Sequence, residues 1–312
     1  MKIERAIVNT DLDGLLSGLL LHHFLGTEIV GFCDSGEYVW KKEGVAWEDC
    51  TFIDMYVPLS GIDTYCNHMI AVDKQHAKTL FGNPHKNNPN VDISTRYFLG
   101  EYPRKFALST FFYLVALLEE AGFCVSRDLI LRNKVEGFRC IDVILRADDV
   151  ANITLNTYRE NALFWWRELI ERSQGGECLS VILTYLNKIH SEELPFNMYS
   201  FKERFFRYVK YSFGCETPDG GYKGLTFANS HLHLGTKHYI HFLSELTGLN
   251  CFPLDISLRV FKGKAQRADL SLEDLEEIRT GSFRGKVLFS YAFVSMPSSP
   301  NHFSCTYDLK KV

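Results

Sequence analysis

Two aspartates near the start of the chain, Asp11 and Asp13, have the spacing of a metal-binding turn. They follow the apolar residues 6–8 and precede Gly14 and an apolar segment that can form a helix. A buried strand that ends in such a turn places both carboxylates at the carboxyl end of a sheet, where open α/β folds bind ligands. Carboxylates this close repel each other unless a cation lies between them, which indicates a divalent-metal site. An Asp-rich turn is also a common helix N-cap, so both interpretations stay open at this point.

Three further aspartates in the first half of the chain also follow apolar runs. Asp54 follows residues 52–53, Asp73 follows residues 70–72, and Asp148 follows residues 141–145. Parallel strands deliver their carboxyl ends to one edge of a sheet. The pattern therefore predicts that these carboxylates gather at one edge.

The order of these residues resembles the DHH phosphoesterase superfamily, which includes RecJ-type single-strand exonucleases, nanoRNases, cyclic-dinucleotide phosphodiesterases and family II pyrophosphatases. The first motif of that superfamily is an apolar strand, then Asp-x-Asp-Gly and a serine three residues on. It is matched by Asp11, Asp13, Gly14 and Ser17. The second motif is a strand that ends in a single aspartate, as at Asp54. The resemblance covers about the first half of the chain.

The fourth motif of the superfamily, Ala-Asp before a helix, is matched at Asp148. Asn156 lies eight residues later, where the family commonly has an asparagine, so Asp148 rather than Asp149 is the expected ligand. Residues 106–122 resemble the buried helix that follows the third motif.

The third motif departs from the family pattern. Asp73 is followed by Lys74 and Gln75, whereas the resemblance implies two histidines there, one on the metal and one facing the phosphate. His76 is the nearby imidazole, one residue out of register. Lys74 would place a fixed positive charge where a metal or histidine otherwise meets the phosphate. We expect one firmly held ion near the first two motifs and a second that is weak or absent.

The resemblance implies a phosphohydrolase that cleaves phosphodiester bonds of single-stranded or short nucleic acid, or of a small nucleotide. Its metal ligands would be Asp11, Asp13, Asp54, Asp73 and Asp148, and its ion Mn²⁺ or Mg²⁺, because carboxylate and water ligands suit these ions. Lys74 and His76 are the expected catalytic groups that neutralise charge on the phosphate. The alternative is a catalytically inactive DHH-like scaffold that binds nucleic acid or a protein partner.

Four residues are expected to contact the substrate. Ser17 belongs to the first motif, and Asn88 lies in residues 84–90 (PHKNNPN), which resemble the Asn-Pro loop after the third motif. Arg284 and Lys286 are candidate phosphate contacts in the C-terminal part.

The alternation of strand and helix patterns predicts an α/β protein of three parts. Residues 1–156 form the DHH-like domain with a parallel sheet, residues 157–215 a helical connector, and residues 216–312 a smaller α/β domain that binds substrate. Helices are expected at residues 161–172, 181–190, 238–248 and 271–281, and strands at residues 253–261 and 286–294.

Composition indicates a cytoplasmic globular protein. The chain has 312 residues and a formal net charge of -4, which argues against nonspecific duplex binding over the whole surface. Nine cysteines are scattered singly, which predicts free, mostly buried thiols in a reducing compartment. No apolar run reaches about 18 residues, so we expect no transmembrane helix, and the first residues predict a strand rather than a signal peptide. A homodimer or a protein partner stays open.

Two other segments have competing interpretations. Residues 201–211 interleave basic and aromatic side chains, as a single-strand channel does, but an amphipathic helix with buried aromatics is favoured. Four histidines lie between residues 231 and 241. Surface histidines are favoured there over a metal site.

Overall fold

The computed structural model describes residues 1–34, 36–68, 71–93, 103–147, 159–194, 196–215, 227–228, 230–294 and 302–311. The chain divides into two compact units. The helical unit comprises Met1–Glu4, Thr10–Ile29 and Ala107–Ile256, and the sheet unit comprises Arg5–Asn9, Val30–Phe106 and Ser257–Val312. This division does not coincide with the expected boundaries after residues 156 and 215.

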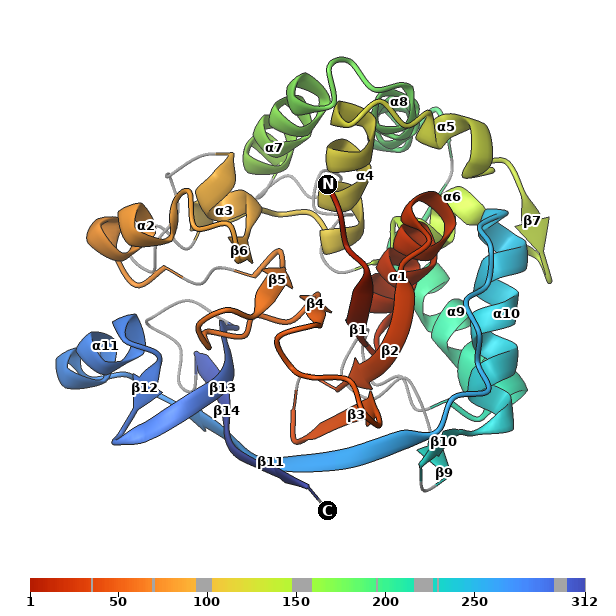
Figure 1. The fold of residues 1–312 in the computed structure, drawn as a ribbon. Helices are drawn as coiled ribbons and strands as arrows, with labels where there is room; N and C mark the ends of the chain where they lie inside the picture. Colours follow the sequence, from red (N-terminus) through yellow and green to blue (C-terminus); the bar gives the residue numbers. More distant parts are fainter. Residues whose placement is uncertain are drawn as a thin grey trace. The chain divides into compact units, whose positions relative to one another are not determined.

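The sheet unit is built on ten strands in the order β12-β13-β14-β11-β3-β2-β1-β4-β5-β6. The strands of its first half are β1 (Arg5–Asn9), β2 (Glu28–Cys33), β3 (Tyr38–Lys42), β4 (Thr51–Ile53), β5 (Asp63–Tyr65) and β6 (Lys86–Asn87). Those of its second half are β11 (Leu258–Ala268), β12 (Ser282–Phe283), β13 (Lys286–Phe293) and β14 (Phe303–Lys311). Residues from the two ends of the chain therefore share one sheet (Figure 1).

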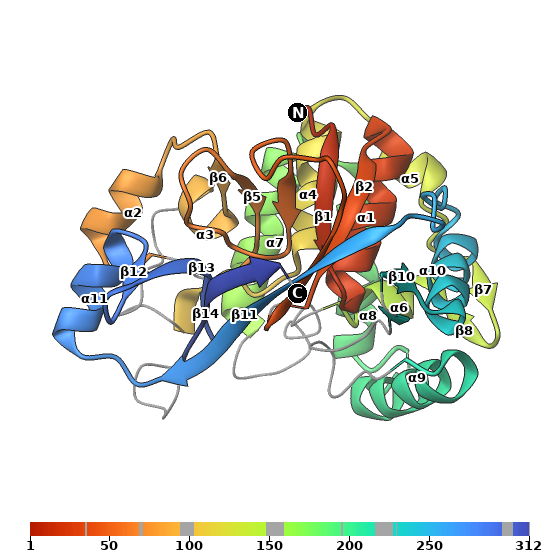
Figure 2. The same cartoon turned by 60° about the horizontal axis from the view of Figure 1, so that its bottom comes forward.

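The strands pair in parallel in one part of the sheet and antiparallel in the other. β1, β4, β5 and β6 are parallel to one another, and β2, β3, β11, β14, β13 and β12 pair antiparallel in that order. Figure 2 shows the long strand β11 beside β14 and β13. A core of buried residues, including Ile7, Val30, Phe52 and Phe289, joins both halves of this unit.

Three helices of the sheet unit lie among the described residues, and their N-caps explain where they begin. They are α2 (Lys74–Leu80), α3 (Pro89–Asp92) and α11 (Leu272–Arg279). Asp73 caps α2, Asn88 caps α3, and Ser271 forms a capping box with Asp274 on α11.

The helical unit contains the remaining helices among the described residues. These are α1 (Leu12–Leu25), α4 (Thr110–Glu120), α5 (Val125–Asp128), α6 (Cys140–Ile144), α7 (Arg159–Arg172), α8 (Glu177–His190), α9 (Met198–Phe213) and α10 (Leu234–Thr247). Two small antiparallel sheets pair β7 (Lys134–Val135) with β8 (Phe138–Arg139) and β9 (Phe227–Ala228) with β10 (His231–Leu232).

Apolar contacts explain how this unit packs. Residues 12–21 of α1 are all buried, and α1 packs on α4. Phe112 of α4 meets Trp166 of α7 edge to face, with ring centroids 5.1 Å apart. α9 and α10 lie side by side (Figure 1), and Phe138 contacts rings from both helices. Such edge-to-face pairs add to the stabilisation from burial.

The fold is mixed α/β, as predicted, and most of the expected elements are present. The helices expected after residue 160 correspond to α7, α8, α10 and α11, and the strand expected at residues 286–294 is β13. None of the described helices is long and apolar enough to cross a membrane.

The expectation of a strand that ends at Val72 was wrong. Ala71 and Val72 form no strand, and Asp73 begins α2 instead. Residues 141–144 belong to the helix α6. The strands β11–β14 extend the N-terminal sheet, because β11 pairs with β3, whereas α10 belongs to the helical unit.

Candidate metal and phosphate site

Asp54 is held at the carboxyl end of the parallel part of the sheet. It directly follows β4, and Asn9 is the last residue of the neighbouring parallel strand β1. Both side chains are 2% exposed. The amide Nδ2 of Asn9 donates to Oδ2 of Asp54 at 3.1 Å. The carboxylate therefore has a fixed direction at the edge where open α/β sheets bind ligands.

The backbone of Asp54 is also unusual. Its φ is 62°, in the left-handed region, while its N–H donates to the Tyr65 carbonyl at 2.7 Å. A residue other than glycine holds this conformation only where its surroundings enforce it, and such residues cluster at functional sites. Asp54 thus combines burial, backbone strain and an oriented carboxylate.

Asparagines continue this edge beyond β5 and β6. Asn88 is 1% exposed, its Oδ1 accepts from Asn90 N at 2.8 Å, and its amide nitrogen donates to the His68 carbonyl. Asn90 donates to the Asn67 carbonyl at 3.0 Å. The predicted substrate residue Asn88 therefore shapes the loop itself. Asn9, Asn67 and Asn90 were not singled out from the sequence; only their places after apolar runs or in the Asn-Pro loop distinguish them.

Asp73 is engaged by the protein at both carboxylate oxygens. Its Oδ1 accepts from the backbone N–H of His76 at 2.8 Å, and its Oδ2 pairs with the guanidinium of Arg279 at the end of α11. Burial opposes ionisation, but these hydrogen bonds outweigh it and lower the pKa of Asp73. Arg279, which the sequence did not reveal as a site residue, therefore pairs with a carboxylate that was expected to bind a metal.

His76 and Lys74 lie at different depths on α2. His76 is 5% exposed, and its Nδ1 accepts from the backbone N–H of Val72 at 3.2 Å. Burial lowers the pKa of His76 to about 4, so its ring is neutral at pH 7. Lys74 is exposed in the first turn of the helix. His76 is therefore structural in this arrangement, whereas Lys74 can meet an anion from solvent.

In the helical unit, Asp13 and Asp11 both act at helix N-termini. The two oxygens of Asp13 accept from Thr110 N and Phe111 N of α4, each at 2.8 Å. Asp11 caps α1 by accepting from Gly14 N at 2.9 Å. The cap interpretation of this turn is thus realised, and the positive helix ends stabilise both charges.

The remaining predicted site residues have separate places. Ser17 is fully buried in the middle of α1. Arg284 contacts Oδ1 and Oδ2 of Asp274 at 3.0 and 3.1 Å, which assigns it to the anchoring of α11. Lys286 is exposed at the start of β13. Asp148, like Asn156, lies outside the described residues.

These contacts separate the predicted ligands into those that suit a divalent cation and one that does not. Asp54 suits it, because it offers a buried, oriented carboxylate beside an amide, the oxygen chemistry that Mn²⁺ and Mg²⁺ prefer. Asp73 does not, because a guanidinium already neutralises it and would repel a metal ion. Within the described ranges, no three His, Cys, Asp or Glu side chains are grouped to hold a metal.

The alternative interpretations of other segments are also resolved. Phe201, Phe205 and Phe206 of α9 are buried, so the amphipathic helix is confirmed. The histidines at positions 231, 233, 238 and 241 are exposed, as predicted for surface residues. All nine cysteines are free and seven are buried, which confirms that prediction for all except Cys124 and Cys251.

No protein-family model, curated protein or solved structure matches this chain.

Proposed function

We propose that this protein is a divalent-cation-dependent phosphohydrolase with Asp54 as its central metal ligand. The supporting observation is the buried Asp54 carboxylate, held at φ 62° beyond β4 and oriented by Asn9 at 3.1 Å. Strain of this kind costs on the order of 1–3 kcal/mol and is retained where a side chain must point in one direction. The order of the aspartate motifs, which resembles DHH phosphoesterases, supports phosphodiester chemistry.

The aspartate motifs supply the other proposed ligands. Asp11 follows Asn9 by two residues in the sequence. Asp13 is the next carboxylate along the chain, and Asp148 is the proposed fourth ligand. Asn9 acts as a positioning residue that keeps Asp54 turned toward its ligand. A bound Mn²⁺ or Mg²⁺ would supply an activated water and polarise a phosphoryl oxygen.

In this proposal Asp73 is no longer a metal ligand. Its pairing with Arg279 leaves one ion in the site instead of the pair found in two-metal phosphohydrolases. Lys74, exposed beside Asp73, is the proposed charge that meets the phosphate from solvent. Single-stranded or short nucleic acid, or a small nucleotide, remains the proposed substrate class.

Mn²⁺ titration by calorimetry, together with hydrolysis of short oligonucleotides, tests this proposal. Wild type should bind one ion per chain, and Asp54→Asn should lose both binding and hydrolysis. Asn9→Leu should weaken Mn²⁺ affinity by roughly 10–100-fold, as loss of outer-shell support does. Asp73→Asn should leave the stoichiometry at one. Asp63→Asn, on β5 and half-exposed, is the matched control.

Unchanged Mn²⁺ binding by folded Asp54→Asn protein would contradict the proposal. So would two equally tight ions in wild type, because Asp73 would then have to ligate the second.

The second candidate is a DHH-like scaffold without catalysis. It is favoured by the Asp73–Arg279 pair and by the use of Asp13 as a cap for α4. A wild-type protein that binds nucleic acid but hydrolyses no substrate with Mn²⁺ or Mg²⁺ would establish this function instead.

A further inference from the structure

The antiparallel half of the sheet unit has two chemically different faces. Val39 of β3, Phe261 of β11 and Phe289 of β13 belong to the core face, together with Leu309 of β14. Side chains alternate along a strand, so the residues between them point to the opposite face. We call that opposite face the lysine face, because it carries Lys262, Lys264, Lys286 and Lys310.

The first row of the lysine face combines aromatic rings with lysines. Lys262 lies directly opposite Tyr38 of β3 on one side and Lys310 of β14 on the other. The Nζ of Lys262 is 5.0 Å from the centroid of the Tyr38 ring. Trp40, two residues along β3, stacks with Tyr38 at a centroid distance of 5.6 Å and an interplanar angle of 22°. Directly opposite residues share a face, so these side chains form one continuous surface.

A second row extends this surface along β11. Lys264 is opposite Tyr307, which is also opposite Leu288 of β13. Lys286, two residues before Leu288, places its Nζ 4.1 Å from the centroid of the Tyr307 ring. Between the two rows, β14 has one residue more than β11, which is a β-bulge. Asp308, within this bulge, has a φ of 55°. This bulge keeps Tyr307 on the same face as Lys310, although the two residues are three positions apart in β14.

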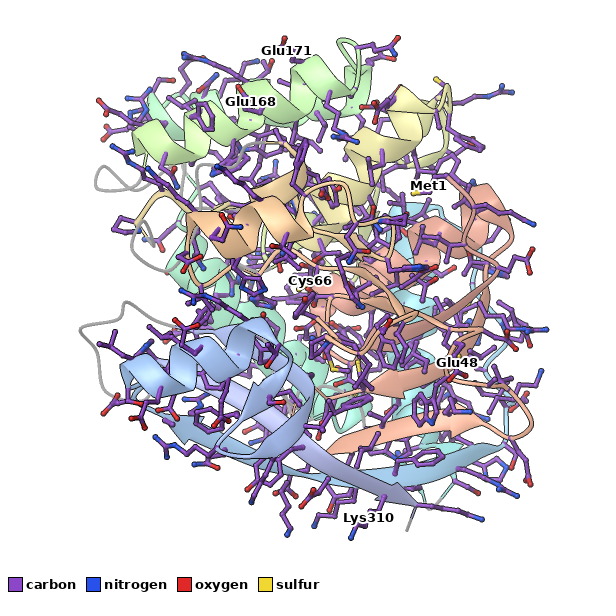
Figure 3. All side chains as sticks on the ribbon, turned by 60° about the vertical axis from the view of Figure 1, so that its left-hand side comes forward. Met1, Glu48, Cys66, Glu168, Glu171 and Lys310 are labelled. Carbon is purple, nitrogen blue, oxygen red and sulfur yellow. The ribbon has the colours of Figure 1, made fainter. Side chains whose placement is uncertain are left out.

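The lysine face carries a local excess of positive charge. Its exposed lysines are Lys262, Lys264, Lys286 and Lys310. Glu37 lies 3.3 Å from Lys262 and Asp308 lies 3.5 Å from Lys264, which offsets part of this charge. The whole chain has a net charge of -4, so the concentration of lysines here is not a property of the entire surface. In Figure 3 the labelled Lys310 and Glu48 lie on opposite sides of these strands.

We propose that the lysine face binds single-stranded nucleic acid. The lysines contact successive phosphates, and the paired Tyr38 and Trp40 rings offer a flat surface on which an unpaired base stacks. A duplex keeps its bases stacked inside and cannot use the rings. This binding is separate from the proposed metal chemistry and does not depend on it.

A solvent-facing antiparallel sheet is ordinarily polar, and lysines alone would satisfy that requirement. The stacked phenol and indole rings are not needed for that purpose, because Tyr38 and Trp40 are half-buried and the ring surface that they leave accessible is apolar. The proposal therefore depends on the stacked rings of Tyr38 and Trp40 lying beside a row of lysines.

Fluorescence anisotropy with a labelled oligothymidylate of about 15 nucleotides tests it, in EDTA to prevent cleavage. Two double variants probe the face: Tyr38→Leu with Trp40→Leu, and Lys262→Gln with Lys310→Gln. Arg207→Gln with Lys210→Gln, which removes two exposed charges from α9, is the matched control. Circular dichroism melting establishes that every variant is folded.

The aromatic double variant should weaken oligothymidylate binding at least about five-fold, because each lost stack is worth that much or more. The lysine double variant should reduce the slope of log K against log salt by about 1.4. The α9 control should bind as wild type, and a duplex of equal length should bind more weakly than the single strand.

Absence of saturable binding by folded wild type overturns the proposal. So does unchanged affinity in both face variants, or a larger loss in the α9 control. Equal binding of duplex, heparin and oligothymidylate would show a general polyanion surface and refute base stacking.

Discussion

The side-chain amide of Asn9 donates to the carboxylate of Asp54 across the neighbouring parallel strands β1 and β4. Asn9 ends its strand, and Asp54 follows its own strand in a left-handed conformation. This hydrogen bond thus couples two strand ends 45 residues apart in the chain. It fixes the direction of the carboxylate on which the proposed metal chemistry depends.

The left-handed backbone at Asp54 predicts an inverted preference between glycine and alanine. Asp54→Gly should be more stable than Asp54→Ala by about 1–2 kcal/mol, because alanine pays the steric cost of positive φ. At Asp63, the first residue of β5, alanine should instead be the more stable by about 0.5–1 kcal/mol. Urea unfolding without metal measures both pairs. The same order at the two positions would contradict the strain at Asp54.

The Asp73–Arg279 pair predicts a small, acid-sensitive stabilisation. Both side chains are about one-third exposed, so Arg279→Met should lower stability only slightly at pH 7. The lowered pKa of Asp73 means that its contribution is complete above the unfolded-state pKa, about 3.9, and is lost as pH falls through the folded-state value.

The difference between wild type and Arg279→Met should therefore shrink between pH 5 and pH 2, as measured by urea unfolding. Arg267→Met, at an exposed position on β11, is the control and should follow wild type. A difference that grows on acidification would reverse the assigned sign.

Lys86 is buried and stabilises the loop at residues 57–62 by hydrogen bonds to its carbonyls. Its Nζ donates to the carbonyls of Val57, Leu59 and Ile62 at 2.8, 2.9 and 2.5 Å. Lys86→Met removes all three donors and should destabilise the protein by roughly 3 kcal/mol, on the order of 1 kcal/mol per carbonyl. The exposed Lys78→Met should change stability little.

The same residue has a distinctive pH dependence. Burial lowers the pKa of Lys86 to about 8, against an ordinary value of 10.5, while Asp63 opposes the shift. The unfolded chain binds more protons between these values, so wild-type stability should gain a favourable contribution as pH rises from 8 to 10.5. This contribution should be missing from Lys86→Met. Parallel pH profiles of the two proteins would refute the assignment.

Arg284 is expected to matter for stability and not for substrate. It pairs with the buried Asp274, so Arg284→Gln should cost about 1 kcal/mol in urea unfolding. Oligothymidylate affinity and hydrolysis should remain as in wild type, because the guanidinium is already engaged. A selective loss of nucleic-acid affinity at unchanged stability would restore Arg284 as a phosphate contact.

Local sequence patterns determined much of the secondary structure. Asp11 marked the beginning of α1, and residues 106–122, which resemble a buried helix of the DHH superfamily, contain the helix α4. The alternation of charges and aromatics in α9 indicated an amphipathic helix, and its phenylalanines are indeed buried. Caps and amphipathic faces depend on residues three or four positions apart, so a single sequence displays them directly.

Only the tertiary structure decided what each aspartate contacts. Asp73 has the sequence context of a metal ligand, yet its partner Arg279 lies 206 residues away. Asp13 meets the N-terminus of α4 97 residues later, and Lys262 joins Tyr38 on one face through the pairing of β11 with β3. A carboxylate accepts a metal ion, a guanidinium or a helix N-terminus through the same oxygens. Its role is therefore set by the group that folding brings to it, which local spacing does not encode.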